Sequence, residues 1–277
     1  SCVCRLPDPG AVLLRLRAPG TGWRAYALAY SEAGRLAMLL DGGRFVVATV
    51  ASHEPEGYFD AYSKAFAALG VTDLIELYVE ERSDSGTAEV LAKLDGAAGV
   101  FFTGGDQLRI SSQIGDTAVE RRIQDLHRRG AVIAGTSGGA SVMSETMLVK
   151  GPSSESYRIG EVHMAPGLGL IRDVIIDQHF AERGRYGRLL GAVAHNPRLL
   201  GVGIDEDTAL LVEGRSAEVV GAGAVYIVDG EAATHSNIAE ARSESALSMF
   251  DIQMHVLAHG DRFDFASRRP AGPPGPD

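Results

Sequence analysis

Cysteine and long apolar runs are scarce in this chain of 277 residues. Its two cysteines, Cys2 and Cys4, are too few for a four-ligand structural zinc site or a disulfide framework, so we expect neither. No run of about 18 apolar residues occurs, so we expect no membrane-spanning helix. The first residues lack the basic start and apolar core of a signal peptide, which favours a cytoplasmic protein, although a secreted form also fits.

Positive charge is also in deficit. The 26 lysines and arginines face 36 aspartates and glutamates, which gives a net charge of −10. Nucleic-acid-binding proteins usually carry basic surfaces, so we expect no nucleic-acid partner. The chain shows no internal repeat and no clear boundary. We therefore predict a single α/β domain over residues 1–266, with a poorly defined segment at 1–43, and a disordered Pro- and Gly-rich tail at 267–277.

Strand and helix patterns alternate from residue 44 onward. Apolar runs typical of buried strands occupy residues 44–51, 74–79, 99–103, 131–135 and 174–178, and helical patterns occupy 58–69, 87–94, about 104–129 and 186–194. This alternation predicts a mostly parallel central sheet flanked by helices. Further strands are predicted at 11–16, 24–30, 201–204, 208–213, 217–221, 225–229 and 251–258, which makes the C-terminal part β-rich. Residues 150–166 are polar and irregular, and we expect a loop or flap there.

The pattern Gly-x-Ser-x-Gly stands at the end of the fourth strand. Ser137 lies between Gly135 and Gly139, after a short apolar run and before small residues that can begin a helix. This is the pattern of a nucleophile elbow, a sharp strand-to-helix turn that lifts the serine hydroxyl away from the sheet. The N–H of Gly138 at the helix start would stabilise a negative charge formed there.

A serine nucleophile needs a base, and the base needs an orienting group. Of the eight histidines, His179 is the best candidate because it follows the strand at 174–178 directly. The strand at 201–204 ends in Asp205, Glu206 and Asp207, any one of which can orient the imidazole. Each element alone is more often a turn, a structural histidine or a solvated acid. Their joint position at strand ends of one parallel sheet favours catalysis, and their order differs from the Ser, acid, His order of α/β-hydrolases.

Four motifs together resemble those of the cyanophycinases. They are Phe-Phe-Thr-Gly-Gly-Asp-Gln at 101–107, Gly-Thr-Ser-Gly-Gly-Ala at 135–140, Asp-Gln-His-Phe at 177–180 and Gly-Ile-Asp-Glu-Asp-Thr-Ala at 203–209. The cyanophycinases are serine exopeptidases related to aspartyl dipeptidase, with a fold similar to class I glutamine amidotransferases, which is flavodoxin-like. The resemblance covers residues from about 44 to 264.

The resemblance implies hydrolysis of cyanophycin, a polyaspartate that carries arginine on each β-carboxylate, to β-aspartyl-arginine dipeptides. It implies Ser137 as nucleophile, His179 as base and Glu206 as orienting acid, with the N–H groups of Gly105 and Gly138 as oxyanion donors. It places six side chains in the substrate pocket: Gln107, Asp177, Gln178, Arg183, Arg185 and Arg188. Substrate arginines need acidic partners, and Asp106 and Asp177 are both candidates for this role. A peptide substrate and a homodimer are expected, and no metal or cofactor is, because no metal-ligand cluster or phosphate-loop motif is present.

The chain departs from the family pattern at two places. Residues 26–34 replace the usual Gly-Gly-Ala-Glu turn, and the elbow has Gly138 where alanine is commoner. Two alternatives therefore remain: a related aspartyl or isoaspartyl dipeptidase, and an inactive binding protein on the same fold. An amidotransferase glutaminase is disfavoured because those enzymes use a cysteine nucleophile, and neither Cys2 nor Cys4 lies near an elbow.

Overall fold

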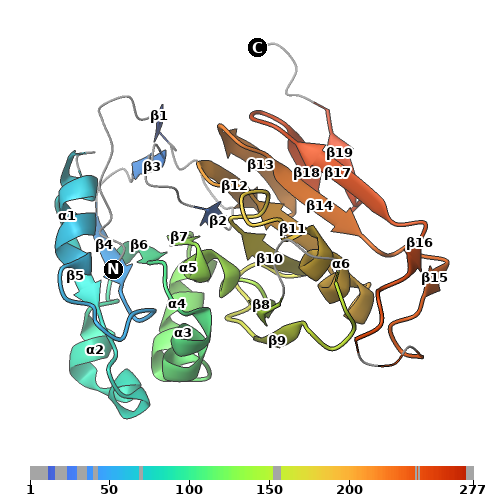
Figure 1. Ribbon diagram of the computed structural model, residues 1–277. Helices are drawn as coiled ribbons and strands as arrows, with labels where there is room; N and C mark the ends of the chain where they lie inside the picture. The colour runs from blue at the N-terminus through green and yellow to red at the C-terminus, as the bar shows by residue number, and fades with distance from the viewer. Residues whose placement is uncertain are drawn as a thin grey trace.

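The computed structural model describes residues 12–15, 24–29, 36–39, 43–68, 71–151, 157–240, 242 and 244–272. Within these residues, helices and strands form an α/β arrangement around two main sheets (Figure 1). Cys2, Cys4 and most of the 26–34 segment lie outside the described residues, and so does the 273–277 end of the predicted tail.

The larger sheet has the strand order β19-β18-β13-β12-β2-β7-β6-β4-β5 in the described part of the chain. Its parallel half consists of β2 (Arg24–Ala29), β7 (Val132–Thr136), β6 (Ala97–Phe102), β4 (Arg44–Ala48) and β5 (Leu74–Leu77). The antiparallel half consists of β12 (Thr208–Glu213), β13 (Ser216–Gly221), β18 (Arg262–Asp264) and β19 (Arg269–Ala271). Strand β2 joins the two halves because it pairs with both β7 and β12.

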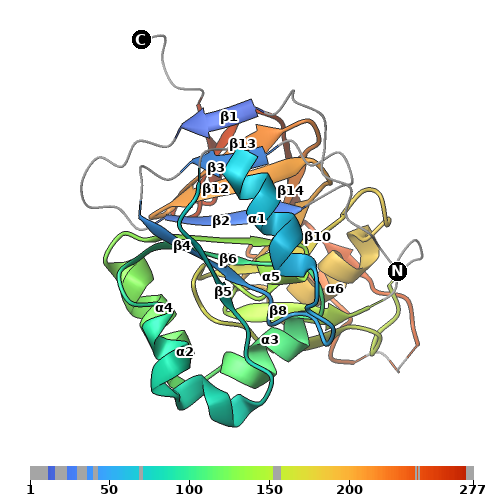
Figure 2. The same cartoon turned by 90° about the vertical axis from the view of Figure 1, so that its left-hand side faces the viewer.

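Helices cover both faces of the parallel half. Because side chains alternate along a strand, Phe45 and Val47 of β4 pack on the side of α1 (Tyr58–Ala68), with Phe66. Val46 and Ala48 pack on the opposite side with α2 (Ala88–Ala92), α3 (Gln107–Ile114) and α4 (Ala118–Arg128). Figure 2 shows these three helices gathered below the strands. A burial of both faces explains why these strands are continuously apolar.

The smaller sheet has the order β10-β11-β14-β17. Strands β10 (Val174–Gln178) and β11 (Leu200–Ile204) are parallel, whereas β14 (Val225–Asp229) and β17 (Gln253–Leu257) are antiparallel to their neighbours. Helix α6 (Tyr186–His195) covers one face of this sheet through Leu189 and Val193. The other face joins the main core through residues such as Ile176 and Val202.

Short elements complete the described structure. They are β1 (Val12–Arg15), β3 (Leu36–Leu39), the 3-10 helix η1 (Arg82–Gly86), α5 (Gly138–Ser141), β8 (Thr146–Lys150), β9 (His163–Pro166), β15 (His235–Ser236) and β16 (Met249–Phe250). None of the described helices has the length and apolar character that crossing a membrane requires.

Four expectations need correction. The predicted loop at 150–166 contains β9, which pairs antiparallel with β8 and forms a hairpin with it. The helical region at 104–129 is two helices, since Gly115 ends α3 and Asp116 takes a left-handed φ of 57°. The predicted disordered tail begins with β19, which hydrogen-bonds to β18. The strand before His179 belongs to the smaller sheet, not to the parallel sheet that carries Ser137.

Candidate active site

Ser137 occupies a sharp turn between β7 and α5. Its φ of 51° and ψ of −119° are unusual for a residue with a Cβ, and such strain concentrates at functional turns. A Cβ on Gly135 would lie 2.1 Å from the carbonyl oxygen of Gly139, and a Cβ on Gly139 would lie 2.3 Å from that of Phe102. The two glycines are therefore required by backbone contacts around the serine, as the Gly-x-Ser-x-Gly pattern predicts.

His179 meets this serine from the smaller sheet. It follows β10 directly, and its Nε2 lies 3.0 Å from Ser137 Oγ, although 42 positions separate the residues in the chain. Helix α5, which begins just after Ser137, packs against β10. The two sheets thus present their carboxyl ends to each other at this point. Ser137 and His179 therefore meet as predicted, but they come from two different sheets and not from one.

Glu206 completes a chain of three polar side chains. Its Oε1 lies 2.7 Å from His179 Nδ1. Strands β10 and β11 are parallel neighbours with Gln178 opposite Ile204, so the residues that follow both strands emerge at the same edge. A carboxylate accepts hydrogen bonds only, which places the imidazole proton on Nδ1 and leaves Nε2 to accept the Ser137 O–H. This is the hydrogen-bond order that a serine nucleophile requires.

The electrostatic surroundings keep His179 ready to accept a proton. Burial lowers the pKa of His179 most, the bond to Glu206 opposes this effect, and the positive charge of Arg183 lowers the pKa further. Only 8% of the residue is exposed. A lowered pKa means that the imidazole is neutral at pH 7, which is the state in which it acts as a base.

Asp205 and Glu182 hold the two loops that carry His179 and Glu206. Asp205 Oδ1 accepts the Ala181 N–H at 2.9 Å, and its Oδ2 accepts the Ala224 N–H at 3.1 Å. Glu182 Oε1 accepts the N–H of Glu206 at 3.0 Å. Of the three acids after β11, Glu206 therefore reaches the imidazole while Asp205 positions backbone. Sequence reasoning missed the role of Glu182, because its partner lies 24 positions away.

The Gly104-Gly105 turn packs directly against the elbow. A Cβ on Gly138 would lie 2.3 Å from the Gly105 carbonyl oxygen, and a Cβ on Gly104 would lie 3.4 Å from Ser137 Cβ. Gly105 has a φ of +139°, and its backbone runs so close to Ala51 that an added Cβ would lie 2.7 Å from the Ala51 oxygen. The turn that follows β6 thus lies within contact of the serine, as the oxyanion prediction for Gly105 and Gly138 requires.

Asp177 and Arg188 form a buried ion pair instead of facing a pocket. The carboxylate of Asp177 is fully buried, and Arg188 Nε donates to its Oδ2 at 2.7 Å. Arg185 Nη1 donates to Asp177 Oδ1 at 3.1 Å. A buried charge must be paired, and these three side chains pair with one another. The sequence predicts Asp177 and Arg188 in the substrate pocket, whereas the structure pairs them with each other inside the protein.

Arg185 extends this cluster toward the serine. Its Nη1 also donates to Gln178 Oε1 at 3.0 Å, and Gln178 Nε2 lies 3.5 Å from Ser141 Oγ on α5. Burial lowers the pKa of Arg185 to about 10, so the guanidinium stays charged at neutral pH. Its Nε is buried and has no hydrogen-bond partner among the described residues.

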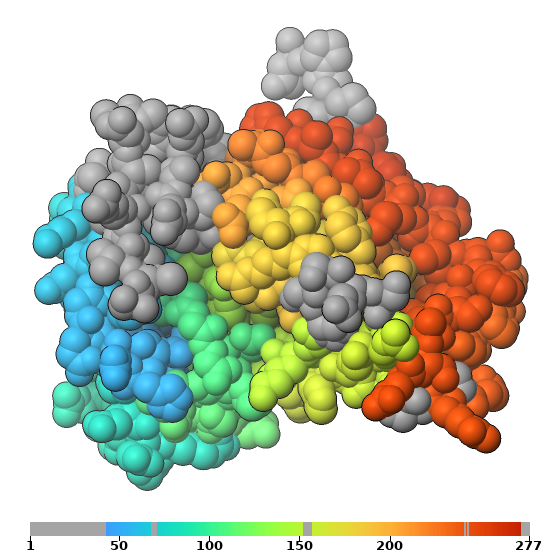
Figure 3. All heavy atoms as spheres, in the orientation of Figure 1, coloured from blue at the N-terminus to red at the C-terminus, as the bar shows by residue number. Residues whose placement is uncertain are grey.

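The remaining predicted site residues differ in accessibility. Arg183 is exposed, and the segment around it, yellow in Figure 3, lies at the surface of the molecule. Asp106 is exposed and caps α3 by accepting the Leu108 N–H at 2.8 Å. Gln107 is buried beside the elbow, where its Nε2 donates to the Leu148 carbonyl at 2.8 Å. Within the described ranges, no group of three or more His, Cys, Asp or Glu side chains is placed to hold a metal ion.

An elbow serine, a neighbouring histidine and a mixed α/β fold define the class of the protein as a serine-type hydrolase. Residues 45–220 match peptidase family S51, and the chain belongs to this family of peptidases. The predicted family resemblance is therefore confirmed.

The chain is similar to curated cyanophycinases. It is 40% identical to the cyanophycinase of Geminocystis herdmanii (strain PCC 6308) over 222 residues, which cover 79% of this chain and 82% of that protein. It is 41% identical to the cyanophycinase of Nostoc sp. (strain PCC 7120 / SAG 25.82 / UTEX 2576) over 220 residues, 79% of this chain and 74% of that protein. The crystal structure of a peptidase from an acI-B1 Actinobacterium has the same fold, with a TM-score of 0.61 at 20% identity over 87% of this chain and 96% of that one. The predicted fold class is confirmed.

Proposed function

We propose that this protein hydrolyses the polyaspartate backbone of cyanophycin and releases β-aspartyl-arginine dipeptides through an acyl-enzyme on Ser137. One observation carries the proposal: the 3.0 Å contact of Ser137 Oγ with His179 Nε2, whose other nitrogen lies 2.7 Å from Glu206. Similarity to curated cyanophycinases at about 40% identity over 79% of the chain supports the choice of substrate.

The reaction follows from the positions of these three side chains. Ser137 Oγ attacks the aspartyl carbonyl carbon while His179 Nε2 takes the hydroxyl proton. The imidazolium, stabilised by Glu206, then gives this proton to the leaving backbone amine as the C–N bond breaks. Water attacks the acyl-enzyme in the same way, with His179 as base, and the product carboxylate leaves. The N–H groups of Gly138 and Gly105 stabilise the oxyanion of each tetrahedral intermediate.

The substrate's charges suit the exposed side chains around the serine. Arg183 binds a free carboxylate at the end of the polyaspartate chain, because guanidinium groups pair with carboxylates through two hydrogen bonds. Arg185, Gln178 and Gln107 are buried beside the elbow, where their hydrogen bonds hold the neighbouring segments in place. The exposed Asp106 binds the guanidinium of a substrate arginine. Asp177, which also binds Arg188, fixes the position of Arg185 through an ion pair.

Mass analysis of the products from purified cyanophycin tests the proposal. We expect β-aspartyl-arginine from the intact protein and a loss of turnover of about 10⁴-fold or more for Ser137→Ala. Ser112→Ala, an exposed serine on α3, is the matched control and keeps full activity. Turnover of cyanophycin by Ser137→Ala at the original rate contradicts the proposal.

Two further measurements separate the alternatives. Faster cleavage of plain aspartyl or isoaspartyl dipeptides than of cyanophycin identifies a dipeptidase of the same family. A fluorophosphonate probe labels Ser137 in an active serine hydrolase, and failure to label this residue in the folded protein identifies a binding protein.

We also propose a homodimer. Strand β17 ends the smaller sheet within the described residues, and it exposes Met254 and Val256, which are 42% and 59% accessible. Edge strands with exposed apolar side chains readily pair with another chain. Light scattering then gives twice the chain mass of 29.2 kDa, and Val256→Lys gives the monomer mass. A monomer mass for the unaltered protein contradicts this assembly.

A cytoplasmic location is proposed from the sequence alone, since the chain has only two cysteines. Fractionation of cells that express the natural gene tests it, and recovery of the protein outside the cytoplasm contradicts it.

A further inference from the structure

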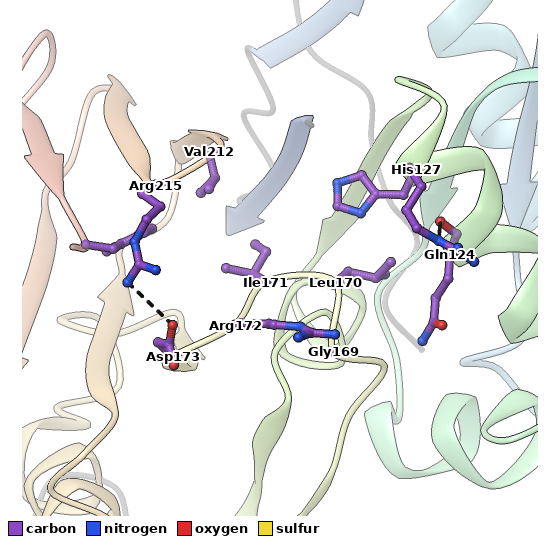
Figure 4. A pocket seen from close by; sticks show the side chains of 12 residues that line it. Gln124, His127, Gly169, Leu170, Ile171, Arg172, Asp173, Val212 and Arg215 are labelled. Atoms are coloured by element: carbon purple, nitrogen blue, oxygen red, sulfur yellow. Dashed lines mark hydrogen bonds and ion pairs between the residues drawn. The ribbon is translucent and has the colours of Figure 1, made fainter. Parts of the chain in front are cut away.

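A pocket lies at the ends of β7 and β10 that are opposite to the elbow. It has a volume of about 490 Å³, within the range of small-molecule sites. Figure 4 shows His127 and Gln124 of α4 on one wall, Val212 of β12 and Arg215 of the β12–β13 turn on the facing wall, and residues 169–173 between them. With Phe265, which also lines it, the pocket is built from four segments far apart in the sequence.

The pocket is separate from the candidate active site. Asp173 directly precedes β10, whereas His179 directly follows it. At a rise of ~3.3 Å per residue, the six steps between these residues span about 20 Å. Likewise, the end of α4 precedes β7, whereas Ser137 follows it. A ligand in this pocket would not touch the serine.

Positive charge gathers at the pocket although the chain as a whole is acidic. Three of its twelve lining residues are arginines, Arg128, Arg172 and Arg215, and one, Asp173, is an acid. Over the whole chain, acids outnumber Lys and Arg by 36 to 26, so this local excess runs against the composition. A concave surface with one sign of charge concentrates ions of the opposite sign.

The arginines are free to change partners. Arg215 Nη2 lies 3.7 Å from Asp173 Oδ2, and both side chains are more than half exposed, so this pair contributes little stability. Arg128 pairs with Asp125 on its own helix, also at the surface. Arg172 is exposed and has no ion-pair partner among the residues that the structure describes.

The inner surface of the pocket is apolar and already in place. Leu170, Ile171, Val212 and Phe265 line it and are each at most 8% exposed. Gln124 Nε2 donates to the Leu168 carbonyl at 3.2 Å, which fastens the segment before β10 to α4. A preformed apolar surface with charged groups at its rim suits a ligand that has both an anionic end and a hydrocarbon part.

We propose that this pocket binds a small organic anion. Arg172 and Arg215 hold its carboxylate or phosphate group, and its hydrocarbon part packs on Leu170 and Val212. The guanidinium fork matches the geometry of both kinds of oxyanion. Binding does not depend on peptidase activity, so this proposal stands or falls apart from the proposed function.

Calorimetric titration of the Ser137→Ala protein tests the proposal with three probes: glutarate, glycerol 3-phosphate and inorganic phosphate. We expect saturable binding of one organic probe with a Kd below ~10 mM, tighter than that of inorganic phosphate. Glutarate and glycerol 3-phosphate distinguish a carboxylate from a phosphate ligand. The double variant Arg172→Gln/Arg215→Gln weakens binding by about tenfold or more, and Arg172→Lys weakens it less because the charge remains.

The matched control is Arg44→Gln/Arg122→Gln. These two arginines form surface ion pairs with Asp73 and Asp95, away from the pocket, and their replacement removes the same charge. All variants replace exposed arginines, so thermal unfolding at the original temperature verifies the fold. The proposal is overturned if no probe binds saturably up to ~10 mM, or if the control variant loses as much affinity as the pocket variant.

Discussion

At the scale of single residues, the proposed reaction depends on the imidazole of His179. His179 has a hydroxyl on one nitrogen and a carboxylate on the other, and its pKa is lowered mainly by burial. Glu206 stabilises the imidazolium and so raises the pKa, whereas the charge of Arg183 lowers it. Activity that needs the neutral imidazole is therefore present above the His179 pKa and is lost as the pH falls through it.

Removing the charge of Arg183 shifts this dependence. In Arg183→Gln the imidazolium no longer faces that positive charge, so the pKa of His179 rises and the acid limb of the kcat/KM profile moves to higher pH. The profile of kcat/KM against pH, which reports the pKa values of the substrate-free enzyme, gives the result directly. Arg122→Gln, which alters a distant surface pair, leaves the limb in place. An acid limb in Arg183→Gln that stays where it was, or moves to lower pH, contradicts the assignment of this histidine.

At the scale of elements, the elbow depends on close contact between two turns. The carbonyl of Gly105, after β6, occupies the space where a Cβ on Gly138 would lie, at 2.3 Å. Because both turns supply the proposed oxyanion donors, we expect a change in their spacing to lower kcat more strongly than it lowers the stability of the fold.

Gly138→Ala tests this contact. The added methyl group must push the Gly105 turn away, which we expect to lower kcat about 10²- to 10³-fold, the usual effect of losing an oxyanion donor. We expect overpacking to cost about 1–3 kcal/mol of unfolding free energy. Gly86→Ala is the control, since a Cβ there meets nothing within 4 Å. Full activity in Gly138→Ala shows that the two turns can separate without consequence.

At the scale of the whole molecule, a buried charge cluster supports the junction of the two sheets. Asp177 on β10 pairs with Arg188 and Arg185, and Arg185 bonds to Gln178, whose amide reaches Ser141 on α5. The cluster thus connects the strand that carries His179 to the helix that follows Ser137. Its integrity is needed both for stability and for the contact of serine with histidine.

Asp177→Ala leaves two buried guanidinium groups without their carboxylate. We expect the free energy of unfolding to fall by ~3–5 kcal/mol, as for other buried pairs that lose one partner. Chemical denaturation measures this change, and Asp95→Ala, which breaks the exposed pair with Arg122, changes it by at most about 1 kcal/mol. Equal effects of the two variants would mean that the cluster contributes no more than a surface pair.

Local patterns in the chain predict most of the elements and the members of the candidate site. The strand at 174–178 and the positions of Ser137 and His179 at strand ends follow from short-range patterns, because strands, turns and helix starts depend on neighbouring residues. The choice of Glu206 over Asp205 and Asp207 came from the family resemblance, since all three stand at the same strand end. The structure brings Glu206 to the imidazole and Asp205 to two backbone N–H groups.

Folding in three dimensions alone decides the rest. The fold places β10 and β7 in different sheets, and it pairs Asp177 with Arg188 inside the protein. It also forms a pocket, lined in part by three arginines, from segments that are distant in the chain. Strand pairing, burial and the meeting of charges depend on which surfaces come together across long sequence separations. No local pattern encodes these contacts, because the same short sequence can occur on a solvent-exposed helix or in a buried cluster of charges.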